Sequence, residues 1–346
     1  MSYRIFTTSE QAWEAMLSDI AQAKTSVYIQ MYILEADMHG EKFVAELEAA
    51  ARRGARVVIL LDSLGSMSFP SDVSDRLRAA GAEILFYSFF FQRMHRKILI
   101  VDERIAFVGG VNVAKAFALW RDLQVRLTGR AIRYMLRSFG RVYVECGGKG
   151  TVPAPKGPHP GHARGRSMRF IEHRSVGKLR ELRRYYTERL QGATDSIVMV
   201  TPYLLPPRWL LAQIHQALLR DIRVEFLIPA ATDHAFASAV NRVYAPVLTR
   251  LGARCFVAPH MNHAKAMLID GREGIIGSQN LDLLSFDWNI EAGVFFEDPD
   301  MVRELSEIII HWKAESVPFE TAVMPSRWFD GAVKLLLKLF TLIPWK

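Results

Sequence analysis

The stretch HRKILIVDERIAFVGGVN occupies residues 95–112 of this 346-residue chain. In it a lysine stands two residues after a histidine, an aspartate follows five residues later, and two glycines and an asparagine lie beyond. The same frame returns 168 residues further on with every internal spacing retained. The paired positions are His95, Lys97, Asp102, Gly109, Gly110 and Asn112 in the first copy, and His263, Lys265, Asp270, Gly277, Ser278 and Asn280 in the second. Such a repeat indicates an internal duplication.

The residues around each histidine predict short strands. His95, Lys97 and Leu99 occupy alternate positions along the strand expected at residues 96–102, and His263 and Lys265 do the same for the strand expected at residues 265–270. Because side chains two residues apart point to the same face of a strand, His95 and Lys97 are expected side by side. A second short strand, at residues 105–108 and again at 274–276, leads to the glycines, which permit a tight turn or close backbone approach to a ligand.

Two imidazoles, two ammonium groups and two carboxamides on matching elements suit one phosphate diester. Cations stabilise its equatorial oxygens, one histidine attacks phosphorus, and the other protonates the leaving oxygen. We expect Lys97, Lys265, Asn112, Asn280 and the Ser278 hydroxyl to hold the phosphoryl oxygens. This set carries enough positive charge that we expect no metal ion and no other cofactor.

A single histidine on a strand is more often a structural residue than a nucleophile, and a lysine beside it is usually a solvated charge. That interpretation does not predict the same residue types at the same offsets twice. The duplication therefore favours a catalytic site.

The frame H-x-K-x4-D-x6-G-[GS]-x-N, present twice, resembles the phospholipase D superfamily, and within it the bacterial cardiolipin synthases and similar phosphatidyltransferases. The segments that carry the resemblance are MHRKILIVDERIAFVGGVNVA, WRDLQVRLTG and GSQNLDLLSFDWNIEAGVFF, and the similarity extends over residues 3–312. It implies two similar phospholipase D-like α/β sandwich halves, related by a pseudo-twofold axis, with one composite active site between them. It also implies His95 as the nucleophile of a phosphohistidine intermediate and His263 as the acid.

A nucleophilic imidazole must be neutral, with its far nitrogen held as a donor by a carboxylate. Asp122 lies 27 residues after His95, and Glu291 lies 28 residues after His263, each at or near the start of a predicted strand. By resemblance, acidic residues at this place orient the histidines, whereas the aspartates of the two frames make supporting structural contacts. The alternative is that both acids are ordinary surface residues.

Strands alternate with amphipathic helices, which predicts an α/β fold with helices on both faces of a sheet. A capping box at Thr8 and Gln11 predicts a helix over residues 10–22. The first half further predicts strands at residues 26–34, 56–62 and 83–87 and helices at residues 41–53 and 72–80. The second half repeats this order, which indicates an N-terminal domain at residues 1–146 and a C-terminal domain at residues 167–320.

The composition, 50% hydrophobic and 23% charged, is typical of a globular protein. Cys146 and Cys255 are the only cysteines, so no disulfide framework is expected. The N-terminus shows no signal-peptide pattern, and no segment has the roughly 18 uncharged apolar residues of a membrane-spanning helix. We expect a monomer, attached peripherally to the cytoplasmic side of the cell membrane.

The net charge of +8 is concentrated in residues 147–184, which hold ten Lys and Arg against two Glu. Such a stretch attracts phospholipid headgroups or nucleic acid, or it is simply a solvated loop. Its first part, residues 147–166, is rich in proline and glycine and is predicted to be a linker. His159 and His162 within it lack cysteine or carboxylate partners, so no metal site is expected there.

The C-terminal residues 321–346 are predicted to associate with a membrane. Lys334 and Lys338 share one face of a possible helix whose other side is apolar, and Trp328 and Trp345 flank it. The apolar part is too short to span a bilayer and fits an interfacial helix. The alternative is a terminal helix packed on the protein core.

These patterns favour transfer of a phosphatidyl group, with anionic phosphatidylglycerol-like lipids as partners. The apolar approach to the first histidine, Phe89, Phe90, Phe91 and Met94, supports a lipid substrate. A phospholipase D-type lipid hydrolase is the first alternative. A nuclease, which the basic stretch would also serve, is less favoured, and no nucleic-acid partner is expected. A non-catalytic membrane scaffold would not need two complete frames.

Overall fold

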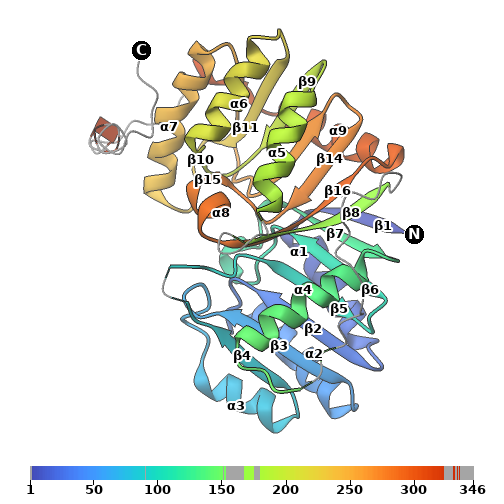
Figure 1. The fold of residues 1–346 in the computed structure, drawn as a ribbon. Coiled ribbons are helices and arrows are strands. Elements are labelled where there is room, and N and C mark those ends of the chain that lie inside the picture. Colours follow the sequence, from blue (N-terminus) through green and yellow to red (C-terminus); the bar gives the residue numbers. More distant parts are fainter. Residues whose placement is uncertain are drawn as a thin grey trace.

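The structure, a computed structural model, describes residues 2–89, 91–150, 152, 167–174, 180–322, 330, 331, 333 and 335. Two α/β halves stack on one another, the N-terminal half in blue to green and the C-terminal half in yellow to red (Figure 1). Each half is a sheet with helices on both faces, so the predicted fold class is confirmed. The predicted linker at residues 147–166 and the predicted C-terminal segment at residues 321–346 lie largely outside the described residues.

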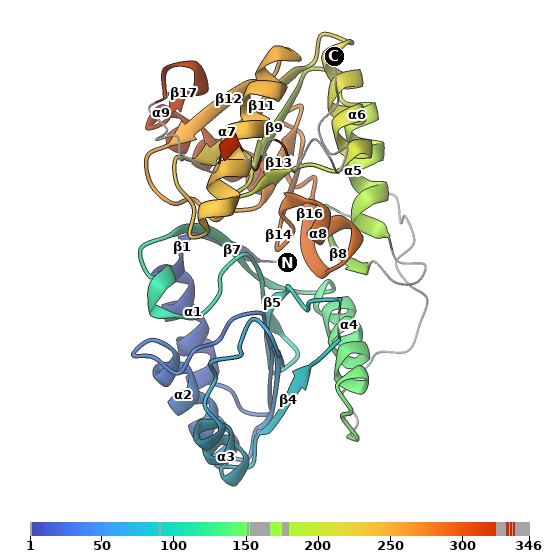
Figure 2. The same cartoon turned by 90° about the vertical axis from the view of Figure 1, so that its left-hand side faces the viewer.

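The N-terminal sheet has seven strands in the order β1-β7-β6-β5-β2-β3-β4. Helices α1 to α3 cover one face and α4 covers the other, as Figure 2 shows. The strands are β1 Tyr3–Thr8, β2 Ser26–Met31, β3 Arg56–Asp62, β4 Glu83–Tyr87, β5 Lys97–Val101, β6 Ile105–Gly109 and β7 Arg121–Thr128. The helices are α1 Ser9–Ala21, α2 Gly40–Arg52, α3 Ser71–Ala79, the 3-10 helix η1 Lys115–Phe117, and α4 Ile132–Glu145.

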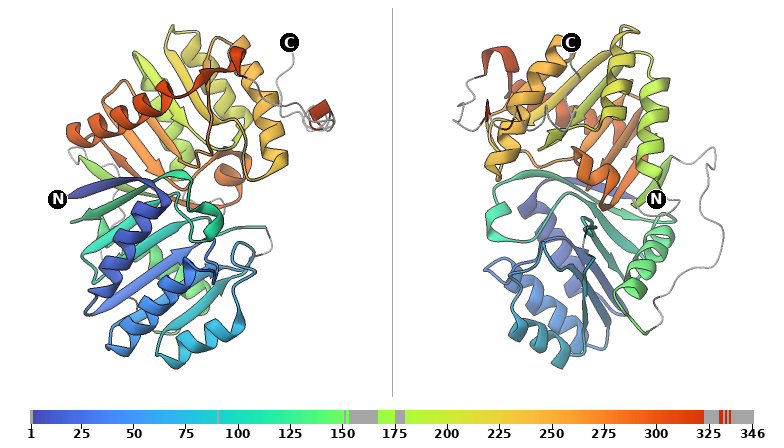
Figure 3. Two further views of the ribbon diagram at one scale, coloured as in Figure 1. Left: turned by 180° about the vertical axis from the view of Figure 1, so that it is seen from behind. Right: turned by 60° about the vertical axis from the view of Figure 1, so that its left-hand side comes forward.

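The C-terminal sheet repeats this order as β8-β16-β14-β13-β9-β11-β12 and adds β17 at the edge. Helices α5 to α7 cover one face, and α9, seen from behind in the left view of Figure 3, covers the other. The strands are β8 Met168–Arg174, β9 Ser196–Val200, β10 Leu204–Leu205, β11 Arg223–Pro229, β12 Arg254–Ala258, β13 Ala266–Ile269, β14 Glu273–Gly277, β15 Leu281–Asp282, β16 Ile290–Phe296 and β17 Val317–Pro318. The helices are α5 Glu181–Gly192, α6 Arg208–Leu218, α7 Ala235–Arg250, α8 Leu283–Asp287, α9 Pro299–Ala314 and the 3-10 helix η2 Phe319–Thr321.

Local sequence explains where several elements begin and end. The Thr8 hydroxyl caps α1 by accepting a hydrogen bond from the Gln11 amide at 3.4 Å. The predicted strand at residues 26–34 ends earlier, at Met31. Beyond it the Ile33 amide donates to the side chain of Asn112 at 3.2 Å, so a side chain replaces the strand partner. This early end turns the chain toward the junction between the halves.

One hydrophobic core is common to both halves. It joins α4 and one face of the N-terminal sheet to α9 and one face of the C-terminal sheet, and two further cores lie beneath α1–α3 and α5–α7. In Figure 2, α4 lies toward the side of α5 and α6, and α9 toward the side of α1 and α2. This exchange of sides is the arrangement that a pseudo-twofold axis produces.

Backbone hydrogen bonds join the two halves at matching places. The amide of His95 donates to the carbonyl of Ile290 at 3.0 Å, and the amide of Ile290 donates to the carbonyl of Arg93 at 2.8 Å. Across the axis, the amide of His263 donates to the carbonyl of Arg121 at 2.7 Å. The backbone of His95 is therefore hydrogen-bonded to the first residue of β16, and the backbone of His263 to the first residue of β7. In each case the strand belongs to the other half.

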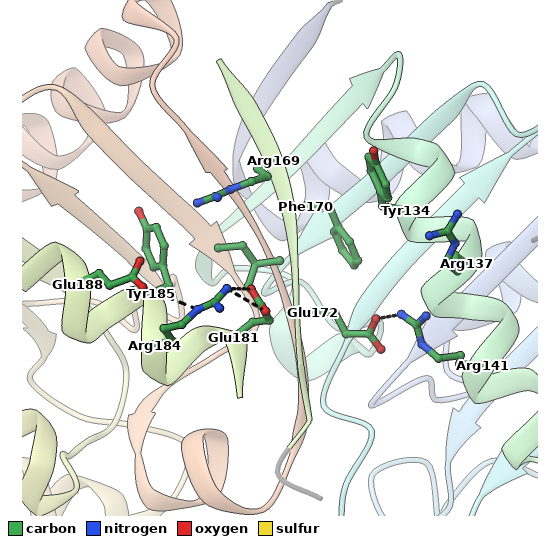
Figure 4. Close-up of a pocket in the computed structure, with 11 residues that line it drawn as sticks. Tyr134, Arg137, Arg141, Arg169, Phe170, Glu172, Glu181, Arg184, Tyr185 and Glu188 are labelled. Atoms are coloured by element: carbon green, nitrogen blue, oxygen red, sulfur yellow. Dashed lines mark hydrogen bonds and ion pairs between the residues drawn. The ribbon is translucent and has the colours of Figure 1, made fainter. Parts of the chain in front are cut away.

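A buried ion-pair network also crosses the junction. Glu172 on β8 accepts a hydrogen bond from Arg141 on α4, drawn in Figure 4, and forms an ion pair with Arg96 at 2.9 Å. Arg96 stands between the two motif residues of the first frame and also donates to the carbonyl of Glu291 at 3.2 Å. Burial raises the pKa of Glu172, but the two guanidinium groups outweigh burial and lower this pKa to about 2. The network thus fixes the position of Glu291 relative to the first frame.

We predict that Glu172→Gln lowers the free energy of unfolding by roughly 3–5 kcal/mol at pH 7, because it leaves the buried Arg96 guanidinium and the partly buried Arg141 guanidinium without their carboxylate. The Glu172 pKa is depressed in the folded state, so its contribution is fully present above the unfolded value and is lost as the pH falls toward 2. Denaturant unfolding at several pH values measures both effects, and the difference between wild type and variant should narrow below pH ~4.5.

Glu181→Gln is the matched control for that experiment, because Glu181 pairs with Arg184 near the same surface but both side chains are exposed (Figure 4). It should change the free energy of unfolding by less than about 1 kcal/mol. Equal destabilisation by the two substitutions would contradict the role of the buried network.

Candidate active site

The two motif histidines face carboxylates of opposite halves. Nδ1 of His95 lies 3.1 and 3.2 Å from the two oxygens of Glu291. Nδ1 of His263 lies 2.6 Å from Oδ2 of Asp122. Each carboxylate follows the histidine of its own half along the chain, yet it contacts the histidine of the other half. The pairs cross because the start of β16 pairs with residues 93–95, just before β5, and the start of β7 pairs with residues 261–263, just before β13.

This pairing determines which imidazole nitrogen is available for chemistry. A carboxylate only accepts hydrogen bonds, so Nδ1 of each ring must be the donor. In a neutral imidazole the lone pair then lies on Nε2. His95 and His263 both line one cavity between the halves. Two Nε2 atoms are thereby available to a single bound group.

The buried charges of the site shift the pKa of His263 and that of Glu291. Burial is the main reason that the pKa of His263 falls to about 4, and the charge of Lys265 lowers it further, although Asp122 opposes both. Burial also raises the pKa of Glu291, but His95 and Lys97 outweigh burial, and the net shift is downward. Without a bound anion, His263 is therefore neutral at pH 7.

Both motif lysines are buried beside their histidines. Nζ of Lys97 donates to the carbonyl of His95 at 2.7 Å, and Nζ of Lys265 donates to the carbonyl of His263. Burial lowers the pKa of Lys97 to about 7 and that of Lys265 to about 8, with Glu291 acting in the opposite direction on both. A bound phosphate diester, being an anion, would favour the charged form of each lysine.

The asparagines of the frames line the cavity, whereas Ser278 does not. The Oδ1 atom of Asn112 is occupied by the amide of Ile33. The Ser278 hydroxyl donates to Glu291 and accepts from the amide of Ala292 at 3.0 Å. We expected this hydroxyl to hold a phosphoryl oxygen, but in the structure its hydrogen bonds go to Glu291 and Ala292. Ser278 positions the carboxylate of the first histidine.

The equivalent residue of the first frame, Gly110, is required by packing. A Cβ atom there would lie 2.2 Å from Oδ1 of Asp122, so any other residue would displace the carboxylate that holds His263. The glycine thus serves close approach to a side chain rather than a tight turn.

The motif aspartates lie at the far ends of their strands. Asp102 follows β5 and accepts hydrogen bonds from the backbone amides of residues 24–26, and Asp270 follows β13 and accepts from residues 194–196. Five residues of strand place Asp102 about 16 Å from Lys97. Both aspartates join the start of a neighbouring strand to the sheet, and neither lines the cavity.

The cavity has a volume of about 610 Å³ and opens between the halves. Besides the histidines and asparagines of the frames, aromatic side chains form much of its wall, which does not include Lys97 or Lys265. Tyr32 and Trp120 lie against His95 and His263 with ring centroids 4.7 and 5.3 Å apart. The remaining wall residues are Ile33, Leu64, Phe91, Arg93, Phe117, Tyr203, Asp233, His234, Asp282, Leu284, Trp288 and Asn289. Most of them come from loops, where sequence periodicity carries no signal.

Asp282 is a wall residue that could have been noticed from its place two residues after Asn280. It is buried, it caps α8 by accepting from the Ser285 amide at 2.7 Å, and burial is the main cause that raises its pKa. Within the described part of the chain, no group of three or more histidine, cysteine or acidic residues has the arrangement of a metal site. In the same part, no helix is long and apolar enough to cross a membrane.

We predict that the crossed pairing is visible in the imidazole N–H resonances. Asp122→Asn should remove the low-field Nδ1–H signal of His263 and leave that of His95, whereas Glu291→Gln should do the reverse. Each variant should lower kcat about 10²–10⁴-fold, because a carboxamide stabilises the imidazolium poorly. NMR of ¹⁵N-histidine-labelled protein tests this, and each variant serves as the control for the other. The crossed pairing would be contradicted if Asp122→Asn removed the signal of His95, or if Glu291→Gln removed the signal of His263.

Comparison with known proteins places the chain in a family. Residues 16–141 and 186–312 match the family model described as "Cardiolipin synthase, PLD-like domain". Among curated relatives, the cardiolipin synthase of Oceanobacillus iheyensis is 30% identical over 87% of this chain and 66% of its own length. That of Listeria welshimeri is 27% identical over 96% and 74%. The chain thus spans about two thirds to three quarters of these relatives.

Solved structures share the fold at low sequence identity. A phosphatidylserine synthase from Haemophilus influenzae superposes with a TM-score of 0.78 at 15% identity, over 98% of this chain and 92% of the other. A polyphosphate kinase from Porphyromonas gingivalis gives a TM-score of 0.63 at 15% identity, over 98% and 53%. Each of the two matched segments of the family model contains one complete frame, and together they cover most of the chain. The chain belongs to the cardiolipin synthase family of phospholipase D-like proteins.

Proposed function

We propose that this protein is a phosphatidyltransferase of the cardiolipin synthase type, which moves a phosphatidyl group between phospholipids through a covalent phosphohistidine. The observation that carries the proposal is the pair of crossed histidine–carboxylate contacts at one cavity. The names of the curated relatives support the choice of substrate class.

In the first step Nε2 of His95 attacks phosphorus, a P–N bond forms, and the P–O bond to the leaving alcohol breaks. His263 gives its proton to the leaving oxygen. In the second step the hydroxyl of the acceptor gives its proton to His263 and attacks phosphorus, and the P–N bond breaks. Glu291 and Asp122 hold the two rings throughout. Lys97 and Lys265 compensate the negative charge of the phosphoryl group.

The assignment of His263 as the acid places a requirement on the substrate. Its pKa of about 4 in the empty site means that the ring is neutral at pH 7. The negative charge of the bound diester stabilises the imidazolium and raises this pKa, so protonation accompanies binding. Proton donation is therefore coupled to substrate occupancy.

The wall of the cavity favours a lipid over a nucleic acid. Leu64, Phe91, Leu284 and Trp288 supply apolar surface at the opening, and Arg93 is the only Lys or Arg among the described residues that form the wall. A groove for nucleic acid carries a row of cations that follows the phosphate backbone. We propose anionic phosphatidylglycerol-like lipids as substrates, and peripheral attachment of a monomer to the cytoplasmic side of the membrane.

The covalent step gives a direct test. With phosphatidylglycerol vesicles the wild type should release glycerol and form a diphosphatidyl product, and acid-labile phosphoryl-enzyme should be trapped. His95→Ala should abolish trapping. His263→Ala should still load slowly from a substrate with a nitrophenolate leaving group, because that group needs no protonation.

His215→Ala is the control for histidine loss, since His215 is exposed on α6 and does not line the cavity. Phosphoryl-enzyme trapped on His95→Ala would reverse the roles of the two histidines. Release of phosphatidic acid with no diphosphatidyl product would show a hydrolase, and cleavage of single-stranded DNA with inert vesicles would refute the lipid assignment.

A second prediction is that activity survives prolonged EDTA treatment. The lysines and imidazoles supply the charge that a metal ion would otherwise supply. Initial rates before and after dialysis against EDTA are the measurement. Complete loss that one divalent ion restores would mean that the electrostatic account of the site is wrong.

A further inference from the structure

Exposed apolar side chains are concentrated around the cavity mouth. The described residues contain fourteen large hydrophobic side chains with extensive exposure, and nine of them lie in or next to segments that form the cavity wall. These nine, which we call the apolar rim, are Met38, Leu64, Met67, Phe89, Phe91, Leu119, Phe236, Leu284 and Trp288. The remaining five, Val144, Leu219, Ile310, Val317 and Leu335, lie elsewhere.

The fold explains why the rim is a single surface. Parallel strands end at the same edge of a sheet, and the segments after β2, β3 and β4 carry the rim residues of the N-terminal half other than Leu119, which follows β6. In the C-terminal half the rim residues follow β11 and β14, the equivalents of β3 and β6. The halves meet at the rim, because the rings of Phe91 and Trp288 contact one another with centroids 6.0 Å apart. In Figure 2, α8, which carries Leu284, lies at this junction.

The rim continues into the active site. Leu64, Phe91, Leu284 and Trp288 belong both to the rim and to the wall of the cavity that holds the two histidines. Apolar side chains are therefore present both on the outer surface and in the wall of the cavity that holds the reacting groups. Met67 is 75% exposed and Leu119 is 89% exposed, so the rim also projects outward. Exposed apolar side chains concentrated in this way are typical of a binding surface.

We propose that the apolar rim is the surface by which this protein docks on a lipid bilayer, with the rim side chains inserted at the boundary between headgroups and acyl chains. The proposal rests on the proposed function, since the substrates are then membrane lipids. A lipid whose acyl chains leave the bilayer along the rim reaches the histidines without exposing those chains to water. Phenylalanine, tryptophan, leucine and methionine are the side chains that suit this depth.

The test uses rim residues that do not line the cavity. The triple variant Met67→Gln, Leu119→Gln, Phe236→Gln removes three exposed apolar side chains, while the cavity wall and the predicted C-terminal membrane segment keep their sequence. The control triple, Val144→Gln, Leu219→Gln, Ile310→Gln, removes three comparably exposed apolar side chains outside the rim. Both are made in the full chain, and both change only surface positions.

The first readout is co-sedimentation with vesicles of equal parts phosphatidylcholine and phosphatidylglycerol. Loss of three inserting side chains should lower the partition coefficient of the rim variant about tenfold or more, with no change for the control. The rate on vesicle lipid should fall in parallel. The rate on a short-chain phosphatidylglycerol below its micelle concentration should stay within about twofold of wild type, because the catalytic groups are unaltered.

Unchanged vesicle binding by the rim variant would overturn the proposal, because another segment would then attach the protein to the membrane. An equal loss of vesicle binding by the control variant would also overturn it. So would the finding that the wild type is a dimer which the rim substitutions dissociate without changing vesicle binding. Failure of the proposed function is a separate result: wild type would bind vesicles through the rim but transfer no phosphatidyl group.

Discussion

The active site depends on one constraint, the exchange of partners across the junction between the halves. The backbone of each motif histidine is hydrogen-bonded to the other half, and its imidazole donates to a carboxylate of that half. Neither half contains a histidine together with the carboxylate that orients it. A half that folded alone would hold an imidazole with an undefined tautomer. The shared core of α4, α9 and the two inner sheet faces therefore serves chemistry as well as stability, because it brings Glu291 to His95 and Asp122 to His263.

Burial gives this junction its electrostatic character. Two lysines, two imidazoles and two carboxylates lie in a region from which water is largely excluded, and each lysine lowers the pKa of a neighbouring group. Lys97 has a pKa of about 7, so a substantial fraction is uncharged at neutral pH when the site is empty. A phosphate diester supplies the negative charge that stabilises the protonated forms. Substrate binding and proton uptake are thus linked, and a neutral ligand of the same shape would not have this effect.

The sequence was informative where repetition or periodicity constrains the chain. The strands at residues 56–62 and 83–87 have the predicted bounds, because β-branched and apolar runs between turns leave little choice. The duplicated frame identified both histidines. The crossing was not predictable, because His95 and Glu291 are 196 residues apart and only the packing of the two sheets decides which carboxylate reaches which ring. Ser278 was assigned to the substrate, since composition alone does not reveal that Glu291 already occupies its hydroxyl.

The two frames place the same motif residues at the same spacing, except that Gly110 stands where the second has Ser278, but they create unequal histidines, and the difference arises in the residues behind the rings. Beside His95 the carboxylate is the longer Glu291, which divides its oxygens between the imidazole and the hydroxyl of Ser278. Beside His263 it is the shorter Asp122, which approaches within 2.6 Å and leaves room only for Gly110. In the proposed transfer reaction one ring attacks and the other exchanges a proton, and the unequal contacts distinguish the two rings. The polar contacts behind the rings produce this inequality, while both histidines keep the same position two residues before a motif lysine.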